Sequence, residues 1–184
     1  MTKKELIQSL IDRTGYLSFS SFKNFLENPY AFIQYKLKLL VKDTNAMVDG
    51  TLLHCMVFEP DEVDKRYLVI PNVNLATKEG KEIMASALLV SNGRIIIKME
   101  RWANMLALKN AIYRNEPAFK LLMQITATEQ RIDFNYGSFK WRGFIDGIGE
   151  HVIIDLKKVV DANPSSFRYT FFKMKYHIQA FLYM

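Results

Sequence analysis

The N-terminal part of the chain places apolar residues at helical spacing. The chain begins with Thr2-x-x-Glu5, a pattern in which each of the two side chains caps the backbone of the other residue. Four apolar residues at helical spacing come after it, namely Leu6, Ile7, Leu10 and Ile11. Together they predict a short amphipathic helix over residues 2–13. A serine after Leu17 is the expected cap of a second helix. Asn28, followed by proline, predicts a third helix from residue 29 to about 40.

The helical pattern continues to about residue 125, with short apolar runs between the helices. The further helices that the spacing predicts cover residues 44–58, 83–90, 98–114 and 116–124. Thr44 is the expected cap of the first of these. Short strands are expected at 67–71 and 94–98, and residues 77–81 are interpreted as a charged turn.

Residues 127–157 change to an alternating pattern, which is typical of strands. Asp146 ends one such alternating run. On a strand, Asp146 would lie on one face, and Trp141, Gly143 and Ile145 would lie on the other. A second alternating run covers 129–135, and a short apolar run begins at Val152. Three consecutive short strands fit an antiparallel meander.

Composition narrows the class of protein. The chain has 184 residues, about half of them hydrophobic, which is enough for one globular domain. Its net charge of +6, from 25 basic and 19 acidic residues, is compatible with an anionic partner such as DNA. Cys55 is the one cysteine, which excludes a disulfide framework and a cysteine-based metal cluster. The polar N-terminus and the absence of a long apolar run predict a cytoplasmic protein without membrane contact.

Two carboxylates and a lysine lie at the ends of the last two predicted strands. Asp146 closes the first strand, and Asp155-Leu156-Lys157 closes the second, where residues two apart point to the same face. A tight hairpin would bring these ends together. Carboxylate oxygens suit Mg²⁺, and an ammonium stabilises charge that develops on a phosphate. Taken alone, the three residues fit either a metal-dependent hydrolase or a solvated strand end.

Two helices carry further candidates, each with a plainer alternative. His54 lies one turn after Gly50, which leaves room beside it, and it is either a partly buried core histidine or a side chain that a ligand can approach. Gln179 and Tyr183 share a helix face. The nearby basic residues, Lys157, Lys158, Arg168, Lys173 and Lys175, fit either backbone phosphates or a solvated face.

Together, these elements resemble the PD-(D/E)XK nuclease superfamily, most closely its RecE-like branch (exonuclease VIII), which is related to the lambda-type phage exonucleases. The matching segments, in order, are the serine-rich start at 17–25 with its following proline, Gly50-x-x-x-His54, Asp146 with Asp155-x-Lys157, and Gln179-x-x-x-Tyr183. The fold that this resemblance implies is α/β (α+β), with a restriction-endonuclease-like core in which helices flank a small mixed sheet, and with an N-terminal helical region.

The resemblance also implies a role for each site residue. One or two Mg²⁺ or Mn²⁺ ions would be held by His54, Asp146, Asp155 and the backbone carbonyl of Leu156. Lys157 would orient or help to deprotonate the attacking water, with Gln179 and Tyr183 holding both in place. Relatives often carry an additional acid near the start of the strands, and Glu129 is the candidate for it here. The alternative interpretation of Glu129 is an exposed charged residue on a strand.

The activity that the resemblance implies is 5′-to-3′ degradation of double-stranded DNA ends in phage or prophage recombination, with 5′-phosphate products. A single-strand annealing protein and a homo-oligomeric ring would be its partners. Some relatives bind an iron–sulfur cluster through cysteines near the proline after residue 28. Asn28 precedes that proline here, so no cluster is expected.

Several alternatives stay open at this point. One is an endonuclease or a single-strand nuclease of the same fold, another is a catalytically silent DNA-binding module, and a third is a basic protein that binds RNA or protein. One domain is expected over 1–184, with a mainly helical part at 1–125 and the catalytic strands and last helix at 126–184. Because relatives usually continue beyond the position of Tyr183, a C-terminal truncation is also expected.

Overall fold

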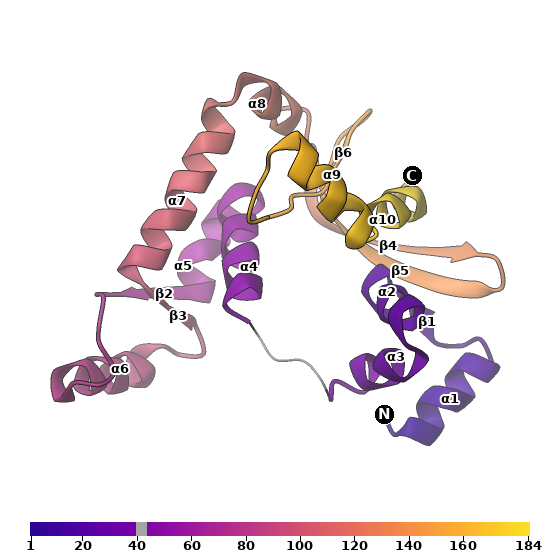
Figure 1. Ribbon diagram of the computed structural model, residues 1–184, viewed down its shortest axis with the longest axis horizontal. Coiled ribbons are helices and arrows are strands. Elements are labelled where there is room, and N and C mark those ends of the chain that lie inside the picture. Colours follow the sequence, from indigo (N-terminus) through magenta and orange to yellow (C-terminus); the bar gives the residue numbers. More distant parts are fainter. Residues whose placement is uncertain (40–43) are drawn as a thin grey trace. The chain divides into compact units, whose positions relative to one another are not determined.

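The structure is a computed structural model that describes residues 1–39 and 44–184 (Figure 1). The chain forms two compact units, each built from separate segments. Unit 1 contains the described residues of Met1–Asp43, together with Glu129–Ile145 and Val159–Met184. Unit 2 contains Thr44–Thr128 and Asp146–Lys158. The prediction of one domain over the whole chain stays a prediction.

The N-terminal helices of unit 1 begin where their capping residues predict. They are α1 (Lys3–Ile11), α2 (Phe19–Glu27) and α3 (Pro29–Lys36), capped by Thr2, Ser18 and Asn28. The capping box of Thr2 and Glu5 is present in full. Helix α3 is shorter than predicted, because Lys38 takes a left-handed φ of 58°. Residue 40, where the predicted helix ended, lies outside the described residues.

The strands of unit 1 meet on β5 (Phe139–Ile148), which is the central strand of its sheet and belongs to unit 2 from Asp146 onward. Strand β4 (Ala127–Tyr136) precedes it in the chain and is its neighbour. Strand β1 (Tyr16–Leu17), which the sequence pattern does not predict, pairs with β5 in parallel. Alternation along β5 is confirmed, since Trp141 and Ile145 are buried. The unit ends with α9 (Pro164–Lys173) and α10 (Tyr176–Tyr183).

Unit 2 is built around a long helix and its apolar core. In chain order its elements are α4 (Asn45–Phe58), η1 (Pro60–Glu62), α5 (Val63–Arg66), β2 (Tyr67–Ile70), α6 (Lys78–Val90), β3 (Ile95–Lys98), α7 (Met99–Arg114), α8 (Glu116–Leu122) and β6 (Ile153–Ile154). Helix α4 packs against α7, as Figure 1 shows. The core between them includes Leu52, Ile97 and Met105, all at most 4% exposed. These apolar contacts hold α4 in place.

Two local predictions for unit 2 are wrong. Residues 77–81 do not form a turn, because Thr77 caps α6 by accepting a hydrogen bond from the Gly80 N–H at 3.1 Å, so the helix begins at Lys78. The last predicted strand is also shorter than expected. Strand β6 covers Ile153–Ile154 and pairs antiparallel with the end of β5, and residues 155–157 continue without strand pairing.

The observed class agrees with the sequence interpretation. The fold is mixed α/β, and its small sheet is mixed because β1 is parallel and β6 antiparallel to β5. A separate parallel pair, β2 with β3, comes from the two short strands predicted at 67–71 and 94–98. Within the described part of the chain, no helix has the length and apolar character needed to cross a membrane.

Candidate metal centre and catalytic residues

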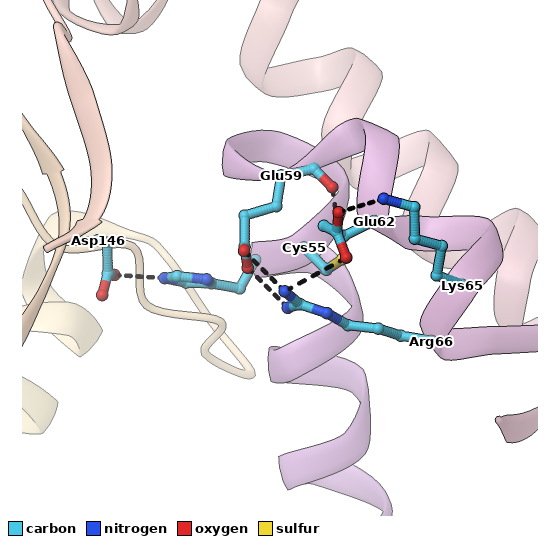
Figure 2. Close-up of polar contacts among 7 residues, drawn as sticks. Cys55, Glu59, Glu62, Lys65, Arg66 and Asp146 are labelled. Carbon is cyan, nitrogen blue, oxygen red and sulfur yellow. Dashed lines mark hydrogen bonds and ion pairs between the residues drawn. The ribbon is translucent and has the colours of Figure 1, made fainter. Parts of the chain in front are cut away.

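His54 and Asp146 are in direct contact within unit 2. Helix α4 carries His54, and the hydroxyl of Thr44 fixes the start of this helix by accepting the Met47 N–H at 3.2 Å. The Nε2 atom of His54 lies 2.9 Å from Oδ2 of Asp146, a contact drawn as the dashed line from Asp146 in Figure 2. The side chains are 20% and 15% exposed, so the pair is largely shielded but open to a small ion.

Asp146 is held in position by the turn that joins β5 to β6. The two strands pair through Gly147 with Ile154, and the Leu156 N–H then donates to Oδ2 of Asp146 at 2.7 Å. Gly147 also lets Ile125 pack closely on this turn, because a Cβ atom at Gly147 would lie 2.6 Å from the Cδ1 atom of Ile125. The expectation that a hairpin brings Asp146 to the Asp155-Leu156-Lys157 segment is therefore confirmed for Leu156.

Asp155 and Lys157 form an ion pair of their own. The Lys157 ammonium lies 2.7 Å from each carboxylate oxygen of Asp155, and the side chains are 26% and 29% exposed. The predicted strand stops at Ile154, yet the two side chains still meet on one side of the extended segment. Leu156, between them, packs against the core of unit 2 and so anchors the segment.

A second carboxylate, which no sequence pattern indicates, binds this segment. Asp49, on α4, lies 3.4 Å from the Lys158 ammonium and also pairs with the Arg101 guanidinium from α7. Arg101 reaches the side chain of Asn45 as well, at 3.1 Å. The partners are far apart in the chain, so no local spacing could have revealed them. Asp49 joins α4, α7 and the residue after Lys157.

A network of charged residues fixes the far end of α4. Glu59 and Arg66 form two parallel hydrogen bonds of 2.7 Å each, and Figure 2 shows their side chains facing each other. These hydrogen bonds raise the pKa of the Arg66 guanidinium above its usual value. Lys65 pairs with Glu62 at 2.6 Å, which lowers the pKa of that carboxyl. The network supports the helix that carries His54.

The donor atoms of unit 2 fit a hard divalent cation. Two neighbouring ligands at about 2.1 Å from an octahedral ion lie about 3.0 Å apart, and the contacting atoms of His54 and Asp146 are 2.9 Å apart. Asp155 precedes Leu156, whose N–H donates to Asp146, and its own carboxylate is paired with Lys157. An oxygen-rich set with one imidazole suits Mg²⁺ or Mn²⁺. Cys55, which would favour a softer metal, is 1% exposed and sits in the core.

The other predicted site residues belong to unit 1. Gln179 is 9% exposed, and Tyr183 packs on β5, where a Cβ at Gly143 would lie 2.6 Å from its ring. Glu129 lies within β4 and has a left-handed φ of 51°. Strain of this kind in a non-glycine residue is concentrated at functional sites. The catalytic roles predicted for these three residues stay predictions.

A polar cavity of about 460 Å³ lies in unit 1. Its lining includes Lys36, Arg142, Tyr183 and the serines at the start of α2. Arg142 lies over the Tyr16 ring at 3.9 Å and pairs with Asp133, while burial, and then the charge of Arg142, lower the pKa of Lys36. Cationic groups beside a helix N-terminus form a site that suits an anion.

Family comparison agrees with the geometry. Residues 18–184 match the model of a family described as a PDDEXK-like domain of unknown function (DUF3799). The chain belongs to this family. Comparison with curated proteins yields no match. Membership in a PDDEXK-like family indicates a nuclease, and nucleases of this type usually use divalent metals, which agrees with the His54–Asp146 pair of unit 2.

Proposed function

We propose that this protein is a divalent-metal-dependent deoxyribonuclease that acts as a 5′-to-3′ exonuclease on linear double-stranded DNA. One observation carries the proposal: unit 2 of this PDDEXK-like chain places His54 on Asp146 and Lys157 on Asp155, with Leu156 joining the two pairs. A solvated strand end gives no reason for a histidine from a distant helix to contact the Asp146 carboxylate, which also accepts the Leu156 N–H. A metal site gives such a reason, because its ligands must lie close together.

Each residue has a defined task in this proposal. His54, Asp146 and Asp155, with the Leu156 carbonyl, would hold one or two Mg²⁺ or Mn²⁺ ions. When bound, the cation lowers the pKa of water and neutralises charge that develops on the phosphate. Lys157 orients the attacking water and helps its deprotonation through the positive charge of its ammonium, which favours the hydroxide form. Asp155 keeps this ammonium in place until substrate arrives.

The charge of the chain supports an anionic polymer as substrate. The net charge is +6, and the cavity of unit 1 offers Lys36 and Arg142 to a phosphate. Tyr183 lines the same cavity, so its hydroxyl is suited to a phosphate contact, with Gln179 one turn before it on α10. Glu129 remains the candidate for an additional site acid.

The finer parts of the proposal rest on the resemblance of the sequence to RecE-like exonucleases. They are 5′-phosphate products, a role in phage or prophage recombination, a single-strand annealing protein as partner and a homo-oligomeric ring around DNA. The ordered segments from Ser18 to Tyr183 support them, and family membership supports the nuclease chemistry beneath them.

Degradation of end-labelled linear duplex DNA with Mg²⁺ tests the proposal, beside a covalently closed circle and a Lys157→Ala variant. We expect loss of the 5′ strand from linear DNA, an intact circle and an inactive variant. Cutting of the circle would replace the exonuclease with an endonuclease of the same fold. If neither DNA is cut while linear DNA is still bound, the protein is a catalytically silent DNA-binding module.

A further inference from the structure

Helix α9 exposes aromatic and basic side chains on one face. Its outward stripe follows helical spacing and consists of Ser165, Arg168, Tyr169, Phe172 and Lys173, which line a hollow of about 510 Å³. Tyr169 is 68% exposed and Phe172 is 51% exposed. The residues of the opposite face, such as Phe167 and Phe171, are partly buried. Helix α9 therefore has an inner apolar face and a distinct outer one.

The chemistry of the outer stripe is unusual for a solvated helix face. It carries two cations and no carboxylate, and the Lys173 ammonium lies 5.6 Å from the centroid of the Tyr169 ring. Exposed helices usually mix both signs of charge and place few large aromatic residues in water. Aromatic rings between cations are instead the pattern of surfaces on which unstacked bases lie while the cations contact phosphates.

We infer that this stripe of α9 binds single-stranded nucleic acid. Bases would stack on the rings of Tyr169 and Phe172, and phosphates would contact the cations of Arg168 and Lys173. The inference deepens the proposed exonuclease function and rests on it for its biological setting, because resection of one strand leaves the other unpaired. Duplex DNA would use the cations but not the rings, since its bases are already stacked.

The stacking positions lie one helical turn apart. Tyr169 and Phe172 are three residues apart on the same face, so their Cα atoms are separated by about 4.5 Å along the helix axis. Neighbouring bases of a flexible single strand can occupy both rings. Phe172 is braced from below by the rings of Phe171 at 5.4 Å and His177 at 5.2 Å, which hold it in place as a platform.

Binding can be measured without cleavage, by fluorescence anisotropy in excess chelator. The probes are a labelled oligothymidylate, an abasic single strand of equal length and a duplex. For Tyr169→Ala/Phe172→Ala we expect the dissociation constant for oligothymidylate to rise about tenfold or more, with no change for the abasic strand. For Arg168→Ala/Lys173→Ala, both single strands should bind more weakly, and the salt slope should fall by up to about 1.4.

Two controls keep the result specific. Leu88→Ala/Leu89→Ala removes exposed apolar side chains from α6, 62% and 85% exposed, and should leave binding unchanged. Tyr169→Leu/Phe172→Leu keeps apolar bulk without aromatic rings and should bind oligothymidylate as weakly as the alanine variant. If the leucine variant binds like the wild type, or if the abasic strand loses affinity equally in the ring variants, base stacking on α9 is wrong.

The outcome is independent of the nuclease assay. If the protein cleaves linear DNA but the ring variants bind oligothymidylate as the wild type does, the inference fails and the proposed function stands. If the protein cleaves no DNA but binds single strands through both rings, the proposed function fails and the α9 surface stands.

Discussion

His54 has a proposed role as metal ligand that a metal titration can test directly. Its Nε2 atom contacts Asp146, and its ring packs on Phe58 with centroids 4.8 Å apart. We expect His54→Ala to raise the Mg²⁺ concentration for half-maximal cleavage about tenfold or more, the loss that removal of even an outer partner of a metal site causes. Cleavage should recover in high Mg²⁺. Metal titrations of the initial rate measure this.

The chain offers a matched control for that variant. His151 is also a histidine of unit 2, but its side chain is 84% exposed on the turn after β5. His151→Ala should titrate with Mg²⁺ like the wild type. Equal metal dependence in His54→Ala and the wild type would mean that His54 is a core histidine that hydrogen-bonds Asp146.

Tyr67 provides a prediction about pH. It is 3% exposed, and burial raises the pKa of its phenol to about 12. The unfolded chain ionises near pH 10 and the folded chain only near 12, so this stabilising contribution is complete below pH 10 and is lost as the pH rises to 12. Denaturant unfolding should show this loss, on the order of 2 kcal/mol, in the wild type but not in Tyr67→Phe. Parallel losses in both proteins would exclude Tyr67 as the cause.

At the level of elements, local chemistry predicted the helices well. The caps at Thr2, Ser18, Asn28 and Thr44 each begin a helix in the structure, because a capping side chain satisfies backbone groups a few residues away. The same chemistry explains the error at 77–81. Thr77 is also a cap, but the charged residues and Gly80 that follow it are equally typical of a turn.

Contacts between distant segments could not be predicted in the same way. Strand β1 has two residues, too few for an alternating pattern, and its partner on β5 lies more than a hundred residues later. Asp49 is likewise separated from Lys158 along the chain. The pairing of Asp155 with Lys157 was predictable because the two residues are neighbours along an extended segment, whether or not it forms a strand.

Asp49 is expected to position the catalytic segment. Its carboxylate joins α4 and α7 to Lys158, the residue after Lys157. Without this charge, Lys157 should sample more positions, and a shift of about 1 Å can cost about 100-fold in rate. We expect Asp49→Asn to slow cleavage about 10- to 100-fold at saturating Mg²⁺ without changing metal affinity, and Asp49→Glu to recover part of the rate. Single-turnover kinetics measure both.

The control for Asp49 is an exposed aspartate of the same unit. Asp64 lies on α5 with an exposed side chain, and Asp64→Asn should cleave at the wild-type rate. If Asp49→Asn loses thermal stability but cleaves at the wild-type rate after correction for folded protein, Asp49 stabilises the fold and does not position Lys157.

At the scale of the whole molecule, metal binding should appear as stability. A ligand that binds only the folded chain at a concentration 100 times its dissociation constant adds about 2.7 kcal/mol. In a chain of this size, such a gain raises the melting temperature by about 5–10 °C. Because His54 lies in one segment of unit 2 and Asp146 and Asp155 lie in another, the unfolded chain does not hold the three together. Saturating Mg²⁺ or Mn²⁺ should therefore raise the melting temperature.

The decisive comparison uses Asp146→Asn, which keeps the shape of the side chain but removes the charge that faces His54 and the Leu156 N–H. This variant should show no stabilisation by metal, while Glu116→Gln, which removes an exposed carboxylate from α8, should be stabilised like the wild type. Lys157→Ala should still be stabilised, since it loses the group that acts on water and keeps every proposed ligand. Equal shifts in Asp146→Asn and the wild type would place the metal elsewhere and leave the carboxylate as a purely structural acceptor.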